Sequence, residues 1–197
     1  MKLISKPCGD LATNCYILEK PCGELIIDPG MEAFEFVIQN TRNPLAILCT
    51  HGHFDHIFDA KKLKEKFNIP IYLPKGDEIL VKSNQFGMLN TPFEPDFLVG
   101  DKEKIIIKDW EILFHHFPGH TPGTSMIEID NIMFSGDFIF SGSIGRSDFD
   151  LSDPNLMKQS IQKVLKYPNF ELFPGHGFAT NLDKERTNLK YFLNLFD

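Results

Sequence analysis

The sequence lacks the features by which membrane-bound and secreted proteins are usually identified. No apolar run approaches the roughly 20 residues that a membrane-spanning helix needs. The N-terminal segment is interrupted by Lys6 and Pro7 before the apolar centre of a signal peptide could form. We therefore expect a cytoplasmic protein that has no membrane partner.

Positive charge is in deficit, and no basic tract occurs anywhere along the chain. The 20 lysines and arginines are outnumbered by 27 acidic residues, which gives a formal net charge of −7. Proteins that bind nucleic acid neutralise its phosphates with clustered basic side chains. The sequence therefore predicts no nucleic-acid partner. It carries no indication of an oligomeric state.

Cysteine is scarce: the chain has only Cys8, Cys15, Cys22 and Cys49, and none forms a C-x-x-C pair. A chain of 197 residues can bury a substantial core without disulfide bonds. We interpret the four cysteines as reduced, mostly buried thiols. The Pro-Cys-Gly sequence that recurs at Cys8 and Cys22 is interpreted as chance recurrence beside turns, rather than as a thiol pair.

The pattern that is present predicts a single α/β domain over residues 1–197. The composition, 42% hydrophobic and 24% charged, is that of an ordinary globular protein. Strands are predicted over 13–18, 24–27, 45–49, 71–73, 105–107, 111–117, 125–129, 132–134 and 170–173. Helices are predicted over 34–40, 57–67, 77–82, 153–165 and 183–196. Strands precede and follow helices in two successive halves, which favours a layered αβ/βα sandwich.

Residues 84–101 are rich in Pro, Gly, Phe and Asn, and are predicted to form a long surface loop. Long ordered loops of compact domains often form lids or the walls of binding sites. Most of the 19 phenylalanines are expected in the core. Phe86, Phe93 and Phe97, within this loop, are candidates for a binding wall.

Three histidines and an aspartate are packed into the six residues that follow the predicted strand 45–49, as His51-Gly52-His53-Phe54-Asp55-His56. Their polar atoms would need partners if they were buried, so the segment is a poor core element. It suits metal binding, because His51 and His53 can turn to the same side and hold one cation. Asp55 and His56 can reach a second. The alternative interpretation is a solvated polar loop.

Three further candidate ligands each follow a predicted strand and are flanked by glycine. They are His120 in Pro118-Gly119-His120, Asp137 in Ser135-Gly136-Asp137, and His176 in Pro174-Gly175-His176. Strand ends are where α/β proteins commonly build their sites. Imidazole nitrogen combined with carboxylate oxygen suits zinc, manganese or iron.

In this order, the residues resemble the metallo-β-lactamase superfamily, and the resemblance covers essentially the whole chain, including Ile27-Asp28-Pro29-Gly30 and residues 118–123. It implies a four-layer αβ/βα metallo-β-lactamase sandwich and a two-metal hydrolase. By resemblance, His51, His53 and His120 bind one metal. Asp55, His56 and His176 bind the other, and Asp137 bridges both. Asp28 is a candidate to support the histidine-rich loop from behind, which is compatible with a turn-forming role.

The segments Gly136 to Phe140 and Ser143 to Asp148 are similar to a short, single-domain branch of the glyoxalase II-like proteins, the hydroxyacylglutathione hydrolases. This implies hydrolysis of a small thioester such as S-lactoylglutathione by a metal-bridging hydroxide. The expected cofactors are two divalent metal ions, with zinc as the expected metal and iron or manganese as alternatives. Asp55 is expected to orient the hydroxide and to accept its proton.

Two departures from that branch leave the thiol part of the substrate open. Asp148 stands where a glyoxalase II has a tyrosine, and the chain ends one predicted helix after His176. Arg146 is either an anchor for a substrate anion or an ordinary surface arginine. His115 and His116 lie within a strand pattern and are interpreted as packing residues.

Other functions remain open on the same residues. Gly145-Arg146-Ser147-Asp148-Phe149 is also similar to persulfide dioxygenases, which use a single iron. Another ester, a lactone, a lactam or a phosphodiester could be the hydrolysed group. A non-enzymatic metal-binding module is disfavoured, because a complete ligand set with open metal positions normally accompanies catalysis.

Overall fold

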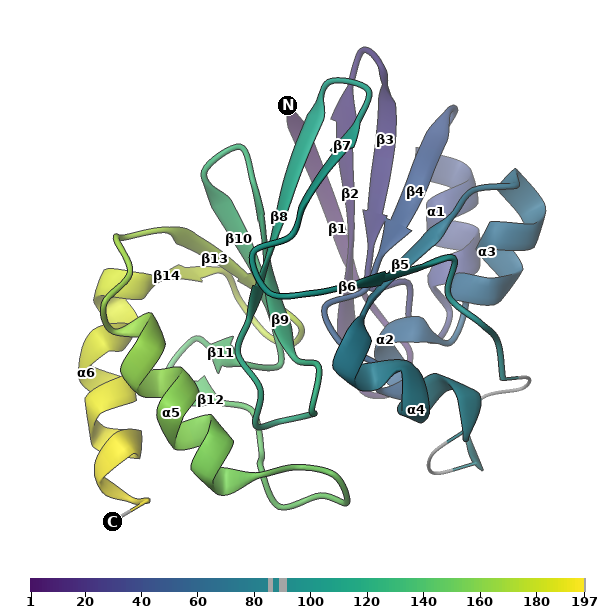
Figure 1. The fold of residues 1–197 in the computed structure, drawn as a ribbon. Helices are drawn as coiled ribbons and strands as arrows, with labels where there is room; N and C mark the ends of the chain where they lie inside the picture. Colours follow the sequence, from purple (N-terminus) through teal and green to yellow (C-terminus); the bar gives the residue numbers. More distant parts are fainter. Residues whose placement is uncertain (85–86, 89–91, 197) are drawn as a thin grey trace.

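The first half of the chain forms a six-stranded sheet with helices on its outer face (Figure 1). The computed structural model describes residues 1–84, 87–88 and 92–196. The strands lie in chain order: β1 (Lys2–Cys8), β2 (Thr13–Lys20), β3 (Gly23–Ile27), β4 (Pro44–Leu48), β5 (Ile71–Pro74) and β6 (Phe97–Val99). The helical segments are α1 (Ala33–Asn40), α2 (Phe54–Ile57), α3 (Ala60–Phe67), η1 (Lys75–Asp77) and α4 (Glu78–Lys82).

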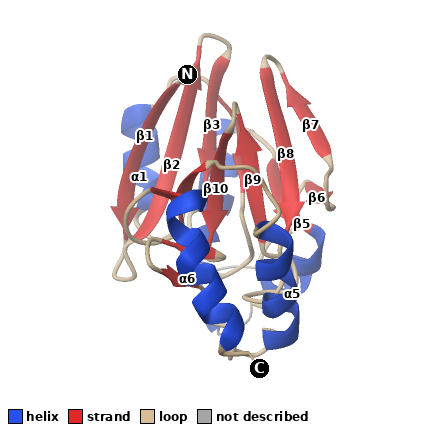
Figure 2. Ribbon diagram, turned by 90° about the vertical axis from the view of Figure 1, so that its left-hand side faces the viewer, coloured by secondary structure: helices blue, strands red, loops and turns tan. Residues whose placement is uncertain are grey.

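The second half forms another six-stranded sheet, and Figure 2 shows its two helices in front of it. The strand order is β14 (Thr180–Asn181), β13 (Glu171–Pro174), β10 (Ile132–Gly136), β9 (Ser125–Ile129), β8 (Trp110–His116) and β7 (Lys104–Ile107). A small hairpin and two helices complete this half: β11 (Ile139–Phe140), β12 (Ser143–Ile144), α5 (Pro154–Val164) and α6 (Leu182–Asn194). No helix within the described ranges is long and apolar enough to cross a membrane.

Three apolar clusters hold the layers together, and they confirm the predicted αβ/βα sandwich. Alternate side chains of a strand point to opposite faces of the sheet. Ile17 of β2 therefore packs towards α1 and α3, whereas its neighbour Leu18 packs between the two sheets. The third cluster lies under α5 and α6, where Met157 and Leu189 are buried against the second sheet.

The structure of the first half differs from the predicted elements at two places. Strand β1 was not predicted, because most of its residues are partly or fully exposed and Pro7 interrupts its pattern. Proline is tolerated there because β1 lies at the edge of the sheet. The helix predicted over 57–67 is broken between α2 and α3, where the backbone N–H of Asp59 donates to the carbonyl of Pro29.

The predicted long loop over 84–101 contains strand β6, which pairs in parallel with β5. Phe86 lies outside the described residues. Phe93 is buried in the first core cluster, and the ring of Phe97 stacks on that of Tyr72 with centroids 4.6 Å apart. Neither ring lines the cavity described below, so the prediction that they form its wall was wrong. Met88, from the same segment, does line it.

Candidate metal centre

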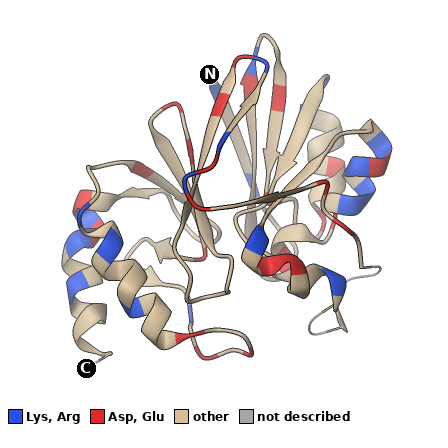
Figure 3. Cartoon of the chain, viewed as in Figure 1, with Lys and Arg blue, Asp and Glu red and all other residues tan. Residues whose placement is uncertain are grey.

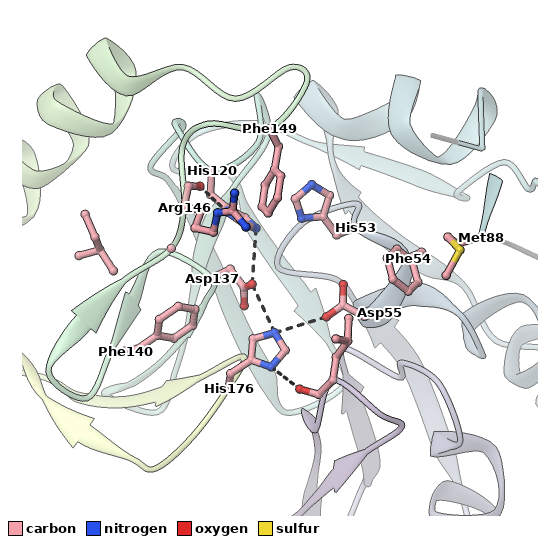
Figure 4. Close-up of a pocket in the computed structure, with 13 residues that line it drawn as sticks. His53, Phe54, Asp55, Met88, His120, Asp137, Phe140, Arg146, Phe149 and His176 are labelled. Atoms are coloured by element: carbon pink, nitrogen blue, oxygen red, sulfur yellow. Dashed lines mark hydrogen bonds and ion pairs between the residues drawn. The ribbon is translucent and has the colours of Figure 1, made fainter. Parts of the chain in front are cut away.

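The ends of four strands bring seven predicted ligand residues together at one edge of the sandwich. The residues from His51 to His56 follow β4, and His120 follows β8. Asp137 directly follows β10, and His176 lies two residues beyond β13, which pairs in parallel with β10. In Figure 4 the side chains of Asp55, Asp137 and His176 point towards one another across a single cavity.

The seven side chains form overlapping sets with the spacing of metal ligands. Three groups have ligand atoms within 4.8 Å of one another: His51, His53 and His120; His51, His56 and Asp137; and Asp55, His56 and His176. The Nε2 atom of His120 lies 3.4 Å from Oδ2 of Asp137, and Nε2 of His176 lies 3.3 Å from Oδ2 of Asp55. Atoms bound about 2.1 Å from one tetrahedral ion are about 3.4 Å apart, so these separations fit metal ligation.

Several of these atoms are buried without a hydrogen bond, which is an independent sign that a cation belongs there. In the described structure this holds for Nε2 of His51, His56 and His120, and for Oδ1 of Asp137. A buried polar atom without a hydrogen bond costs roughly 1–3 kcal/mol. Divalent metal ions, which these nitrogen and oxygen donors prefer, would satisfy all of them.

The opposite ring nitrogen of four of the histidines is held by a neighbouring oxygen, which aims Nε2 at the cluster. A donor role for Nδ1 leaves the lone pair of Nε2 free to bind metal. The four contacts are His51 to Thr50 Oγ1 at 3.1 Å, His56 to Asp28 Oδ2 at 2.9 Å, His120 to the Arg146 carbonyl at 2.7 Å and His176 to the Leu11 carbonyl at 3.0 Å.

Asp28 lies directly behind the histidine-rich loop and contacts its first residues through its carboxylate. Its Oδ1 atom accepts from the backbone N–H of Thr50 at 2.7 Å, and its Oδ2 accepts from the Thr50 hydroxyl at 2.7 Å. Its backbone has a φ of 49°, a left-handed conformation that aspartate tolerates better than most residues. The carboxylate therefore orders the start of the loop and the ring of His56 together.

Gly175 shows how closely the backbone approaches the cluster. A side chain at this position would overlap Oδ1 of Asp137 and Cε1 of His56. Only glycine therefore lets β13 reach the ligands and present His176 beside them.

The electrostatics of the site are those of ligands that need a cation. Burial lowers the pKa of His51 well below its usual value, and that of His53 to about 3. Burial opposes protonation of His176 too, but its hydrogen bonds to Asp137 and Asp55 raise its pKa to about 9. Burial tends to raise the pKa of Asp55, but the charge of His56 and the hydrogen bonds from His176 and Thr13 together outweigh it, and the pKa falls to about 2. In the metal-free site, the proton on His176 therefore supplies part of the positive charge that the carboxylates of Asp55 and Asp137 attract.

Two polar residues that support the site were missed by reasoning from sequence. Thr13 donates its hydroxyl to Oδ2 of Asp55 at 2.7 Å. Asp77 is fully buried and accepts hydrogen bonds from Gly52, Thr121 and Gly123; burial, opposed by these bonds, raises its pKa to about 6. Asp77 follows the predicted strand 71–73, just as the candidate ligands follow strands, and this position could have identified it as a site residue.

Arg146 lines the mouth of the site, whereas His115 and His116 do not. The cavity has a volume of about 770 Å³, and Arg146 lies on its wall together with His53, Asp55, His120, Asp137 and His176. His115 instead contacts Glu128 at 2.7 Å and Tyr167 at 3.1 Å. His116 contacts the carbonyl of Pro122 at 2.8 Å, and neither histidine belongs to a ligand group.

Comparisons with known proteins agree with this geometry. Residues 8–176 match the family model described as the metallo-beta-lactamase superfamily. The chain is 37% identical to "Hydroxyacylglutathione hydrolase GloC" of Haemophilus influenzae, over 95% of this chain and 96% of that protein. Its structure resembles a crystal structure of the BLEG-1 B3 metallo-beta-lactamase, with a TM-score of 0.86, 28% identity and coverage of 97% and 99%. A di-iron-bound form of TTHA1623 matches with a TM-score of 0.77, 32% identity and coverage of 92% and 96%.

Proposed function

Because this chain belongs to the metallo-beta-lactamase superfamily, we propose that it hydrolyses a small thioester with two divalent metal ions. His51, His53 and His120 would hold one ion, Asp55, His56 and His176 the other, and Asp137 would contact both. The proposal is supported chiefly by the two ligand groups, which share Asp137 as a neighbour and open onto one cavity. The thioester is suggested by the similarity to the hydroxyacylglutathione hydrolase of Haemophilus influenzae.

When bound, the two metal ions would supply the chemistry that the side chains of the site lack: a water that is nucleophilic near neutral pH and a polarised acyl carbonyl. Zinc is the expected ion, and the di-iron form of the related TTHA1623 keeps iron as an alternative. In the overall reaction, a C–O bond to water forms and the C–S bond of the thioester breaks. The products are a carboxylate and a thiol.

Asp55 is the residue proposed to handle the proton of the attacking water. Its carboxylate lies on the cavity wall, and its Oδ2 atom is held by the hydroxyl of Thr13 at 2.7 Å. An anchored carboxylate at this place can orient water and accept its proton. A thiolate is a good leaving group, so the sulfur needs no dedicated acid beside it.

A cytoplasmic location is part of the proposal. All four cysteines are free thiols in the structure, and Cys8, Cys15 and Cys49 are buried. Chains that keep unpaired cysteines suit a reducing compartment.

The proposal is tested by purifying the protein, counting its metals and assaying S-lactoylglutathione beside a panel of thioesters, lactones and phosphodiesters. We expect two metal ions per chain and hydrolysis of at least one thioester. Asp55→Asn is expected to lower kcat by at least about a hundredfold while the protein still binds metal. A single iron with oxygen uptake would overturn the proposal, whereas full activity of metal-loaded Asp55→Asn would contradict the role given to Asp55.

A further inference from the structure

The wall of the cavity above the ligand cluster is mostly apolar. Its carbon surface comes from six side chains of separate segments: Leu11, Phe54, Met88, Phe140, Ile144 and Phe149. Figure 4 shows Phe149 and Phe54 on either side of His53, with Met88 beyond Phe54. Binding against this wall is favourable for an apolar substrate group, because apolar surface is removed from water. The wall offers few hydrogen-bond partners to a polar substrate group.

Arg146 is the single lysine or arginine among the described residues that line this cavity. Its Nε and Nη2 atoms donate to the two carboxylate oxygens of Asp148, each at 2.8 Å. The guanidinium also lies over the ring of Phe149, 4.3 Å from its centroid. This two-point hydrogen bond occupies the Nε–Nη2 edge of the guanidinium, one of the two edges with which an arginine can bind a substrate carboxylate.

The segment around Arg146 carries more negative than positive charge. Between β12 and α5 the chain has Asp148, Asp150 and Asp153 beside this one arginine. Figure 3 shows red, acidic segments along the loop that leads to α5. The whole chain has a net charge of −7. An anionic substrate would therefore meet a guanidinium whose charge is already balanced by the carboxylate of Asp148.

We infer that the site selects thioesters whose acyl and thiol parts are uncharged and apolar, and that Asp148 sets this preference by occupying Arg146. The inference rests on the proposed thioesterase function and narrows its substrate class. The thiol part of glutathione brings two carboxylates and one ammonium group, so its esters carry a net negative charge. Those esters should be disfavoured relative to neutral esters with the same acyl group.

The test uses the metal-loaded full-length protein and two thioesters with the same hexanoyl group. One ester is made with N-acetylcysteamine, which is neutral, and the other with glutathione. We expect kcat/KM to be at least about tenfold higher for the neutral ester. Along acetyl, butanoyl and hexanoyl esters of N-acetylcysteamine, kcat/KM should rise by up to about fourfold per methylene, the limit for complete burial.

The role of Asp148 is tested with Asp148→Asn, which frees the guanidinium and removes one negative charge. The ratio of kcat/KM for the glutathione ester to that for the neutral ester should rise by about tenfold. Asp183→Asn is the matched control. Asp183 is paired with Arg186 at 2.8 Å on helix α6, so this variant makes the same charge change away from the cavity and should leave the ratio unchanged.

The outcomes separate this inference from the proposed function. If wild-type protein prefers the glutathione ester, or if Asp148→Asn and Asp183→Asn give the same ratio as wild type, the inference is overturned while the thioesterase function stands. If the metal-loaded protein hydrolyses no thioester at all, the proposed function fails and takes the inference with it. Asp148 is exposed, so its substitution is expected to leave the fold intact, which circular dichroism checks.

Discussion

Oδ2 of Asp77 accepts a hydrogen bond from the backbone N–H of Gly52 at 2.7 Å. The same oxygen accepts from the hydroxyl of Thr121 at 2.7 Å, and Oδ1 accepts from the N–H of Gly123. One buried carboxylate therefore ties the loop of His51 and His53 to the loop of His120. These three histidines form one of the ligand groups, so Asp77 sets their relative positions without touching the metal site.

Asp77→Ala is expected to destabilise the metal-free protein by about 3 kcal/mol, because it leaves the N–H groups of Gly52 and Gly123 buried without partners. Urea unfolding at pH 7, followed by circular dichroism, measures the change. Glu65→Ala is a suitable control, since Glu65 lies exposed on α3 and its removal should change stability by no more than about 0.5 kcal/mol. Equal stabilities of the two variants would show that Asp77 is not a structural link.

Asp28→Asn is expected to weaken metal binding by about 10- to 100-fold while the protein stays folded. The carboxylate accepts three hydrogen bonds, from His56 and from two groups of Thr50. The amide NH₂ group of asparagine would face one of these three hydrogen-bond donors, which removes an acceptor and frees the ring of His56 to rotate. Titration of the metal-free protein with zinc, against a competing chelator, gives the affinity. An unchanged affinity would mean that the ring of His56 needs no support from Asp28.

Metal binding should release protons and strengthen as the pH rises. In the metal-free protein, the carboxylates of Asp137 and Asp55 overcome the effect of burial and hold the pKa of His176 at about 9. A metal ion must therefore displace that proton at pH 7. Affinity should increase by up to about tenfold per pH unit for each proton displaced, and the contribution of His176 should level off near pH 9. Calorimetry in buffers of different ionisation enthalpy counts the protons, and a count of zero at pH 7 would contradict the prediction.

Removing the metal is expected to lower the melting temperature as well as to abolish activity. A ligand present at 100 times its Kd stabilises the folded state by about 2.7 kcal/mol. For a chain of this size, that corresponds to roughly 5–10 °C. Thermal unfolding with and without a chelator measures the shift. His51→Ala removes a member of two ligand groups and should reduce the shift; a shift of the same size in this variant would place the metal elsewhere.

Much of the layered fold was predictable, because buried residues recur at every second position in a strand and at every third or fourth position in a helix. Alternating apolar residues indicated β8 and β9, and the period of Met157, Ile161 and Val164 indicated α5. Strand β1 was not predictable in this way, since an edge strand buries little and shows no clear alternation. Its place depends on pairing with β2, which is a contact between distant backbone groups rather than a property of its own sequence.

The candidate metal ligands could be recognised from local chemistry, because His51, His53, Asp55 and His56 stand in one short segment and His120, Asp137 and His176 each follow a predicted strand beside glycine. That these segments converge on one cluster, and that Asp77 and Thr13 hold it in place, follows only from how the chain packs in three dimensions. The apolar wall of the cavity and the pairing of Arg146 with Asp148 are likewise visible only in the tertiary structure. A ligand type is local, whereas a cavity and its charge balance arise only when segments far apart in the chain pack together.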